Sequence, residues 1–320
     1  MVVAVEDTQV YDHPDLRGSL LPGTDLLETE QGHKQQEPSS HGTLMAGLIA
    51  AHGQGANMGA LGIAPKARIL PVRVQPDVEQ GTTDALAAGV EWATAKNVDV
   101  ISVSSVAGAS ARLQRAVRAA LDADIVVVAA AGNRPEDMSV GYPASFEGVI
   151  AVGGIDQTGG HALVSVAGPG VDVVAPAVDI YSTSYGGKYS KGTGTSSATA
   201  IVAGAAALIR SKYPDLPAEE VAHRLTATAI DKGPPGRDDE YGYGVIDLVA
   251  ALTADVPPLG FESATATPPA SAQALPGDES AGATTTRGLV TLGVLLAAGG
   301  GYLVWRRCRR AEDPPPRISR

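Results

Sequence analysis

The sequence predicts an α/β fold with a mostly parallel central sheet and helices on both of its faces. Short, nearly continuous apolar runs alternate along the chain with longer segments of helical pattern. This alternation is typical of parallel strands that are buried on both sides. The composition favours the same fold, because 44 % of the 320 residues are hydrophobic and only 4 % are aromatic. Small aliphatic side chains must therefore form most of the core.

The first strand that we expect is Val2–Val5, which is followed directly by Glu6 and Asp7. An apolar run that ends in an acidic residue is typical of a parallel strand with a carboxylate at its C-terminal end, where ligand chemistry gathers in such folds. A charge at Glu6 is costly if it is buried without a partner. The polar stretch from there to Ser40 is expected to form a loop.

Strands and helices then alternate as far as Ala229. We expect the further strands at Ile69–Val74, Val98–Val103, Ile125–Ala130, Val149–Val152 and Val171–Ala175. We expect the helices at His41–Ala50, Thr83–Lys96, Ser110–Asp122, Ser197–Lys212 and Pro217–Ala229. Pro217 is a good helix start, because its missing N–H does no harm in the first turn.

The stretch Gly194-Thr195-Ser196 places a serine where a long apolar helix begins. Free backbone N–H groups and the helix dipole favour negative charge at that position. A turn that simply caps a buried helix is the alternative interpretation, since threonine and serine are good N-caps.

Two distant residues favour a nucleophile over a cap. His41 opens the run His-Gly-Thr-Leu-Met-Ala-Gly, and Asp7 follows the first strand. A serine hydroxyl needs an imidazole to take its proton, and the imidazole needs a buried carboxylate to orient it. The chain order Asp7, His41, Ser196 is one of the known orders of such a triad, and no Gly-x-Ser-x-Gly elbow follows a strand here.

On these residues the chain resembles the subtilisin-like serine peptidases of the S8 family, from Val2 to about Ala251. Further segments carry the resemblance in the same order along the chain: Leu61-Gly62-Ile63-Ala64-Pro65, Ala129-Ala130-Ala131-Gly132-Asn133, Tyr142-Pro143-Ala144, Val173-Val174-Ala175-Pro176 and Tyr241-Gly242-Tyr243-Gly244. The resemblance implies the three-layer fold of that family and hydrolysis of peptide bonds through an acyl-enzyme.

The resemblance also implies roles for individual residues. Ser196 would attack the scissile carbonyl, His41 would act as base and then acid, and Asp7 would orient His41. Asn133 would donate its amide to the oxyanion beside the Ser196 N–H. Two strips would bind an extended substrate: Ser102, Val103, Ser104, Ser105 and Val106, and Ala130, Ala131 and Gly132. This chemistry needs no metal or cofactor, and the sequence has no metal-ligand spacing.

The composition changes after the expected peptidase domain, residues 1–253. Residues 254–286 are rich in proline, alanine and threonine and predict a linker. The 18 residues 288–305 carry no charge. As a helix they span about 27 Å, close to the ~30 Å hydrocarbon core. We therefore expect a single transmembrane helix over 287–306, with a buried soluble helix as the alternative because Gly299–Gly301 interrupts it.

The tail, residues 307–320, is basic, and positive flanks stay in the cytoplasm. We thus expect a cell-membrane protein with the peptidase domain outside and the tail in the cytoplasm. This architecture is similar to that of the mycosins, membrane-bound peptidases associated with type VII secretion. The resemblance implies exported proteins as substrates and the secretion machinery as a partner. The alternative function is a structural subunit of that machinery with weak or no proteolysis.

The charge and the cysteine content indicate which partners and which disulfide bonds to expect. The net charge is −11 although the C-terminal segment is basic, so the body of the protein repels phosphate backbones and we expect no nucleic-acid partner. The only cysteine is Cys308, which precludes an intrachain disulfide. Met1 runs directly into the first strand, so no signal peptide is visible in this sequence. We therefore expect either that the true start lies upstream or that the protein is not exported as written.

Overall fold

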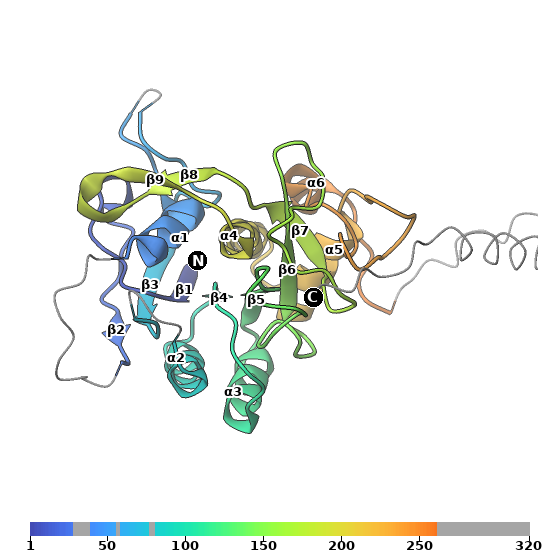
Figure 1. The fold of residues 1–320 in the computed structure, drawn as a ribbon, viewed down its shortest axis with the longest axis horizontal. Helices are drawn as coiled ribbons and strands as arrows, with labels where there is room; N and C mark the ends of the chain where they lie inside the picture. The colour runs from blue at the N-terminus through green and yellow to red at the C-terminus, as the bar shows by residue number, and fades with distance from the viewer. Residues whose placement is uncertain (28–38, 56–57, 77–80, 261–320) are drawn as a thin grey trace, which may run out of the picture. The chain divides into compact units, whose positions relative to one another are not determined.

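The computed structural model describes residues 1–27, 39–55, 58–76 and 81–260, all within one compact unit, Met1–Ser263. A sheet of seven parallel strands runs through this unit in the order β2-β3-β1-β4-β5-β6-β7 (Figure 1). The strands are β1 (Val2–Asp7), β2 (Thr24–Asp25), β3 (Arg68–Arg73), β4 (Val100–Val103), β5 (Val126–Ala130), β6 (Ile150–Ile155) and β7 (Val173–Pro176). The predicted α/β fold with a parallel sheet is confirmed.

Helices cover both faces of this sheet. They are α1 (His41–Ala50), α2 (Thr83–Ala95), α3 (Ala111–Asp122), α4 (Thr195–Lys212), α5 (Ala218–Ala227) and α6 (Leu248–Thr253). Figure 1 shows α2 and α3 on one face and α1 and α4 on the other. Val221 and Leu225 of α5 belong to the same core as α1 and α4. Two short 3-10 turns, Pro14–Leu16 and Tyr185–Gly187, lie outside these layers.

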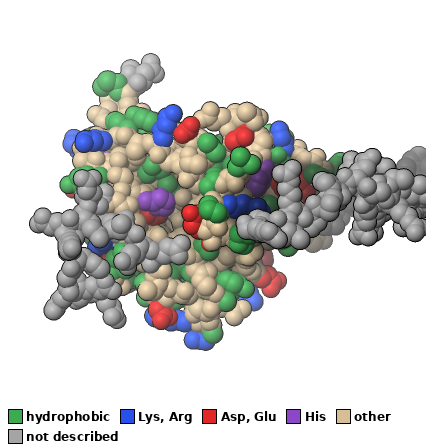
Figure 2. Space-filling model, viewed as in Figure 1, with side chains coloured by type: hydrophobic (Ala, Val, Ile, Leu, Met, Phe, Trp, Pro, Cys, Tyr) green, Lys and Arg blue, Asp and Glu red, His purple; other side chains and the backbone are tan. Residues whose placement is uncertain are grey.

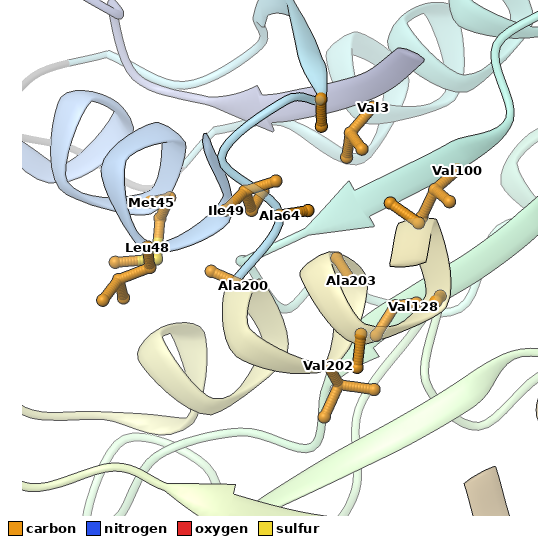
Figure 3. Close-up of a cluster of buried hydrophobic side chains, with 14 of the residues drawn as sticks. Val3, Met45, Leu48, Ile49, Ala64, Val100, Val128, Ala200, Val202 and Ala203 are labelled. Carbon is orange, nitrogen blue, oxygen red and sulfur yellow. The ribbon is translucent and has the colours of Figure 1, made fainter. Parts of the chain in front are cut away.

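The alternation of side chains along β1 explains why there is a core on each face. Val3 and Val5 belong to the core under α1 and α4, whereas Ala4 between them belongs to the core under α2 and α3. Figure 3 shows the first of these cores, where Val3 and Val100 of the sheet face the helices. Because every central strand is buried on both faces, its sequence is apolar at nearly every position.

Helix α4 passes through the centre of the larger core. Its small residues let it approach its neighbours closely: a Cβ on Gly204 would lie 2.8 Å from Cβ of Ile63. Ala200 and Ala203 are fully buried against α1 and the sheet (Figure 3). The start of α4, which carries Ser196, is therefore held in the middle of the fold.

The structure contains elements that the sequence did not predict. These are the two-residue strand β2, the short helix α6, and an antiparallel hairpin of β8 (Ile180–Thr183) and β9 (Tyr189–Gly192). The hairpin packs on α1, and the Ser182 and Thr183 hydroxyls donate to the carbonyls of Leu44 and Thr43. Its polar sequence is thus explained by hydrogen bonds to a helix rather than by burial in the sheet.

The predicted linker is described only as far as residue 260. The predicted transmembrane helix, 287–306, and the basic tail, 307–320, lie outside the described residues. Within the part of the chain that the structure describes, no helix combines the length and the apolar character that a membrane crossing requires.

Candidate active site

Three separate elements bring Asp7, His41 and Ser196 together. Asp7 ends β1, His41 is the first residue of α1, and Ser196 is the second residue of α4. Strand β1 lies near the middle of the sheet, and α1 and α4 cover the same face of it. The C-terminal end of a central strand and the N-terminal ends of two helices therefore meet at one edge of the sheet, as expected for this class of fold.

The three side chains form a continuous hydrogen-bonded line. His41 Nδ1 lies 2.7 Å from Asp7 Oδ1, and His41 Nε2 lies 3.1 Å from Ser196 Oγ. A carboxylate can only accept, so Asp7 fixes the proton on Nδ1 and leaves Nε2 free to accept from the serine hydroxyl. Asp7 Oδ1 also accepts from the backbone N–H of Thr8 at 2.7 Å, which holds the carboxylate in place.

Burial differs along this line in a way that suits proton transfer. Asp7 has no exposed surface and Ser196 is buried, whereas 37 % of the His41 side chain is exposed. Burial alone would lower the pKa of His41, but the charge of Asp7 and its hydrogen bond together raise that pKa above the ordinary value of 6.5. Asp7 therefore stabilises the imidazolium that forms when His41 takes a proton.

The hydroxyls at the start of α4 do not cap the helix. The N-cap is Gly194, which has no side chain to cap the helix. Ser196 Oγ lies against His41, and Thr195 Oγ1 donates to Gly132 O at 3.3 Å and to Asn133 Oδ1 at 3.2 Å. The interpretation of this turn as a simple helix cap is therefore wrong.

Asn133 is oriented toward the nucleophile by its neighbours. Its Oδ1 accepts from Thr195 N at 2.8 Å as well as from Thr195 Oγ1. Because Oδ1 is occupied, the amide Nδ2 remains as a donor for a ligand. Gly194 (φ +151°) lies close by, and a Cβ there would be 3.3 Å from the Asn133 amide and 3.4 Å from Ser196 Oγ. The glycine keeps this space open.

A cavity of about 380 Å³ opens at the triad. Its lining includes His41, Ser196 and Asn133 together with four residues of the predicted substrate-binding strips, Ser104, Ser105, Val106 and Ala130. Figure 2 shows one face of the molecule, on which histidine (purple) and acidic side chains (red) lie next to each other. The cavity thus brings His41 and Ser196 into the same space as residues of both predicted strips.

The structure does not place the other four strip residues on the cavity. The side chains of Ser102 and Val103 are fully buried within β4, because this end of the predicted strip belongs to the sheet. Ala131 and Gly132 are also buried, and their carbonyls accept from Gly141 N and Val166 N. These four residues support the cavity wall instead of lining it.

Several lining residues were not predicted from the sequence. They are Thr8, Ser39, Gln75, Pro76, Glu136 and Asp137. Thr8 directly follows Asp7, and its Oγ1 accepts from Gly42 N at 3.0 Å, so its position beside Asp7 was a usable signal. The others lie on loops whose return to the cavity depends on tertiary contacts.

Glu6 is buried on the face of β1 opposite to the triad. Its side chain has no exposed surface and lies against Gly89 of α2. Neither of its carboxyl oxygens has a hydrogen bond among the described residues. Burial therefore raises the pKa of Glu6 well above its ordinary value. Within the described residues, no group of three or more His, Cys, Asp or Glu is arranged to hold a metal ion.

Comparison with known proteins gives a consistent set of relatives. The model of the Subtilase family matches residues 1–244. The chain is 39 % identical over 246 residues to a thermostable alkaline protease of Halalkalibacterium halodurans, covering 76 % of this chain and 65 % of that protein. It is 41 % identical to subtilisin E of Bacillus subtilis (78 % and 65 % covered). With subtilisin DY of Bacillus licheniformis the identity is 39 % (78 % and 89 % covered).

Solved structures with the same fold include MycP1 from Mycobacterium smegmatis, at 29 % identity and a TM-score of 0.69, covering 80 % of both chains. A structure of MycP1 from the ESX-1 type VII secretion system has a TM-score of 0.70 at 29 % identity, covering 80 % of this chain and 81 % of that one. Fervidolysin from Fervidobacterium pennivorans has a TM-score of 0.69 at 33 % identity, covering 80 % and 43 %.

Proposed function

Because the chain belongs to the subtilase family of serine endopeptidases, we propose that it hydrolyses peptide bonds through Asp7, His41 and Ser196. The observation that carries this proposal is the position of His41, within hydrogen-bond distance of both Asp7 Oδ1 and Ser196 Oγ. An imidazole in this position can take the serine proton and pass it on without moving.

The proposed reaction begins when Ser196 Oγ attacks the scissile carbonyl carbon and its proton passes to His41 Nε2. The carbonyl oxygen becomes an oxyanion, which accepts from Asn133 Nδ2 and from the Ser196 N–H at the start of α4. His41 then protonates the leaving amine, the C–N bond breaks, and an ester remains on Ser196. Water, deprotonated by His41, hydrolyses this ester and restores the serine.

The direct test is hydrolysis of a fluorescently quenched casein by the purified chain and by Ser196→Ala. We expect hydrolysis by the wild type and a loss on the order of 10⁶ in kcat for the variant, since the nucleophile is removed. A well-folded wild type that cleaves no faster than Ser196→Ala would contradict a peptidase and would favour a structural role.

We further propose that the enzyme is anchored in the cell membrane through residues 288–305 and cleaves exported proteins outside the cell, in association with type VII secretion. Two observations support this: the uncharged segment is followed by a basic tail, and the fold is similar to MycP1 from the ESX-1 type VII secretion system. Expression of the full chain and of a version ending at residue 286 tests the anchor. The full chain should stay with membranes after carbonate extraction and the shorter one should not. Equal extraction of both would contradict the anchor.

A further inference from the structure

Two carboxylates line the cavity and have no part in the proposed reaction. Glu136 and Asp137 share its lining with His41 and Ser196. Among the described lining residues there is no lysine or arginine. A cavity with two carboxylates and no fixed cation has a negative potential that attracts a positive group on a ligand.

The loop after β5 holds these carboxylates next to the oxyanion donor. Asp137 N donates to Asn133 O at 2.8 Å, and Asn133 N donates to Asp137 Oδ2 at 2.8 Å. The pair of bonds closes a turn over residues 133–137. Asp137 is half-buried in this turn and Glu136 beside it is exposed. The turn therefore presents both acidic side chains at the cavity on the side of Asn133.

The strip Ser104–Val106 ends in a valine that packs on a neighbouring loop. A Cβ on Gly141 would lie 2.2 Å from Cγ1 of Val106, so the valine packs directly on the glycine backbone. Val106 also lines the cavity, together with Ala130 of the other strip. A long, unbranched side chain can lie along these apolar residues and carry its charged end to the carboxylates.

We infer that the enzyme selects substrates with lysine or arginine immediately before the scissile bond, recognised by Glu136 and Asp137. The inference rests on the proposed peptidase function and adds its substrate class. The aliphatic part of such a side chain would lie between Val106 and Ala130, and its cationic end would pair with the two carboxylates. Asp137 keeps its bond to Asn133 N, so the same side chain would connect substrate charge to the residue that binds the oxyanion.

The test is a set of fluorogenic peptides that differ only in the residue before the scissile bond: lysine, arginine, glutamine, leucine or glutamate. A partly exposed ion pair contributes up to about 1 kcal/mol, so two carboxylates should raise kcat/KM for lysine about tenfold over glutamine. Glutamate should be the poorest substrate. Active enzyme is titrated with a fluorophosphonate, so that every rate refers to reactive Ser196.

Variants assign the selectivity to these side chains. Glu136→Gln should lower the lysine-to-glutamine ratio, and the double variant Glu136→Gln/Asp137→Asn should bring it close to one. Asparagine at 137 keeps an oxygen for Asn133 N. Glu147→Gln is the matched control, because this substitution also removes one negative charge. Glu147 is exposed and lies outside the lining of this cavity. Its ratio should equal that of the wild type.

The outcomes separate this inference from the proposed function. Suppose that the wild type reacts with the fluorophosphonate but cleaves the glutamine or leucine peptide at the same rate as the lysine peptide. That result overturns the selectivity and leaves the proposed peptidase function standing. A lysine preference that persists in the double variant overturns the assignment to Glu136 and Asp137. A folded wild type without fluorophosphonate reaction overturns both.

Discussion

Asn133 shows how a single side chain is prepared for its role by bonds that it makes elsewhere. Thr195 donates twice to Asn133 Oδ1, from its backbone N and from Oγ1. The amide is therefore turned with Nδ2 outward before a substrate arrives. A donor that is already oriented stabilises a developing charge without reorganisation, which is the physical basis of an oxyanion hole.

Replacement of this donor should reduce the rate and leave binding nearly unchanged. For Asn133→Ala we expect kcat to fall about 10²–10³-fold with little change in KM, because the amide contributes mainly in the transition state. Steady-state kinetics on a peptide substrate measures both constants. Thr195→Val keeps the hydrogen bond from the backbone N of residue 195 to Asn133 Oδ1. Its kcat should therefore fall much less than that of Asn133→Ala. A KM effect as large as the kcat effect would show that Asn133 binds substrate instead.

The pH profile of the enzyme should depend on Asp7. His41 must be neutral to accept the serine proton, so kcat/KM rises with pH through the pKa of His41. Asp7 raises this pKa above 6.5, so we expect the wild-type profile to rise above that pH. Asp7→Asn should move the rise to lower pH and reduce the rate about 10⁴-fold. An unchanged midpoint in Asp7→Asn would contradict the electrostatic role given to this carboxylate.

Glu6 is expected to make the fold less stable as the pH rises. Burial raises the pKa of its folded state above that of the unfolded chain, so the folded state binds the proton more tightly. The stability that this provides is complete at low pH, below the unfolded pKa of about 4.3, and is lost as pH rises toward the folded pKa.

Glu6→Leu should therefore raise the melting temperature more at pH 8 than at pH 4. An unsatisfied buried polar group costs about 1–3 kcal/mol, and each kcal/mol shifts Tm by about 2–4 °C in a domain of this size. We expect a gain of several degrees at pH 8 in calorimetry. A loss of stability at both pH values would indicate that Glu6 has a partner in the folded protein.

The loop after β4 and the loop after β5 pack against each other through Val106 and Gly141. Val106 follows β4, Gly141 follows β5, and Ala107 pairs with Tyr142 beside them. The absence of a side chain at 141 is required by the valine, because a Cβ there would meet its Cγ1 at 2.2 Å. The two positions are therefore coupled although they are far apart in sequence.

Because the two positions are coupled, we expect a smaller residue at position 106 to restore the stability that a substitution of Gly141 removes. Gly141→Ala should destabilise the protein by about 1–3 kcal/mol through overpacking, and Val106→Ala in the same chain should recover most of that loss. Denaturant unfolding of the two single variants and the double variant measures the coupling energy. Gly108→Ala is the control, since a Cβ at Gly108 would meet nothing within 4 Å. Additive effects at 106 and 141 would contradict the contact.

At the scale of the whole molecule, the elements that form the core were predictable and those held by polar contacts were not. Strand β1 and helices α1 and α4 are dense in apolar and small residues, so the alternation alone located them. The hairpin β8–β9 carries tyrosine, serine and threonine, and its place depends on hydrogen bonds to α1. A pattern of hydrophobicity does not report such bonds.

The same distinction applies to the active site. Asp7, His41 and Ser196 lie in short local motifs that predict a triad, and the structure places His41 within hydrogen-bond distance of the other two. The predicted strip included Ser102 and Val103 because they belong to the same motif as Ser104–Val106, but their side chains are buried in β4. Glu136 and Asp137 were missed, since only the turn closed by Asn133 brings them back to the cavity.

The most direct test of the whole account is the mass of the chain after reaction with a fluorophosphonate, followed by peptide mapping. An activated serine reacts once, so we expect a single adduct at Ser196 in the wild type and none in Ser196→Ala or His41→Ala. A folded wild type that stays unmodified, or an adduct at another residue, would contradict the claim that Asp7 and His41 activate Ser196.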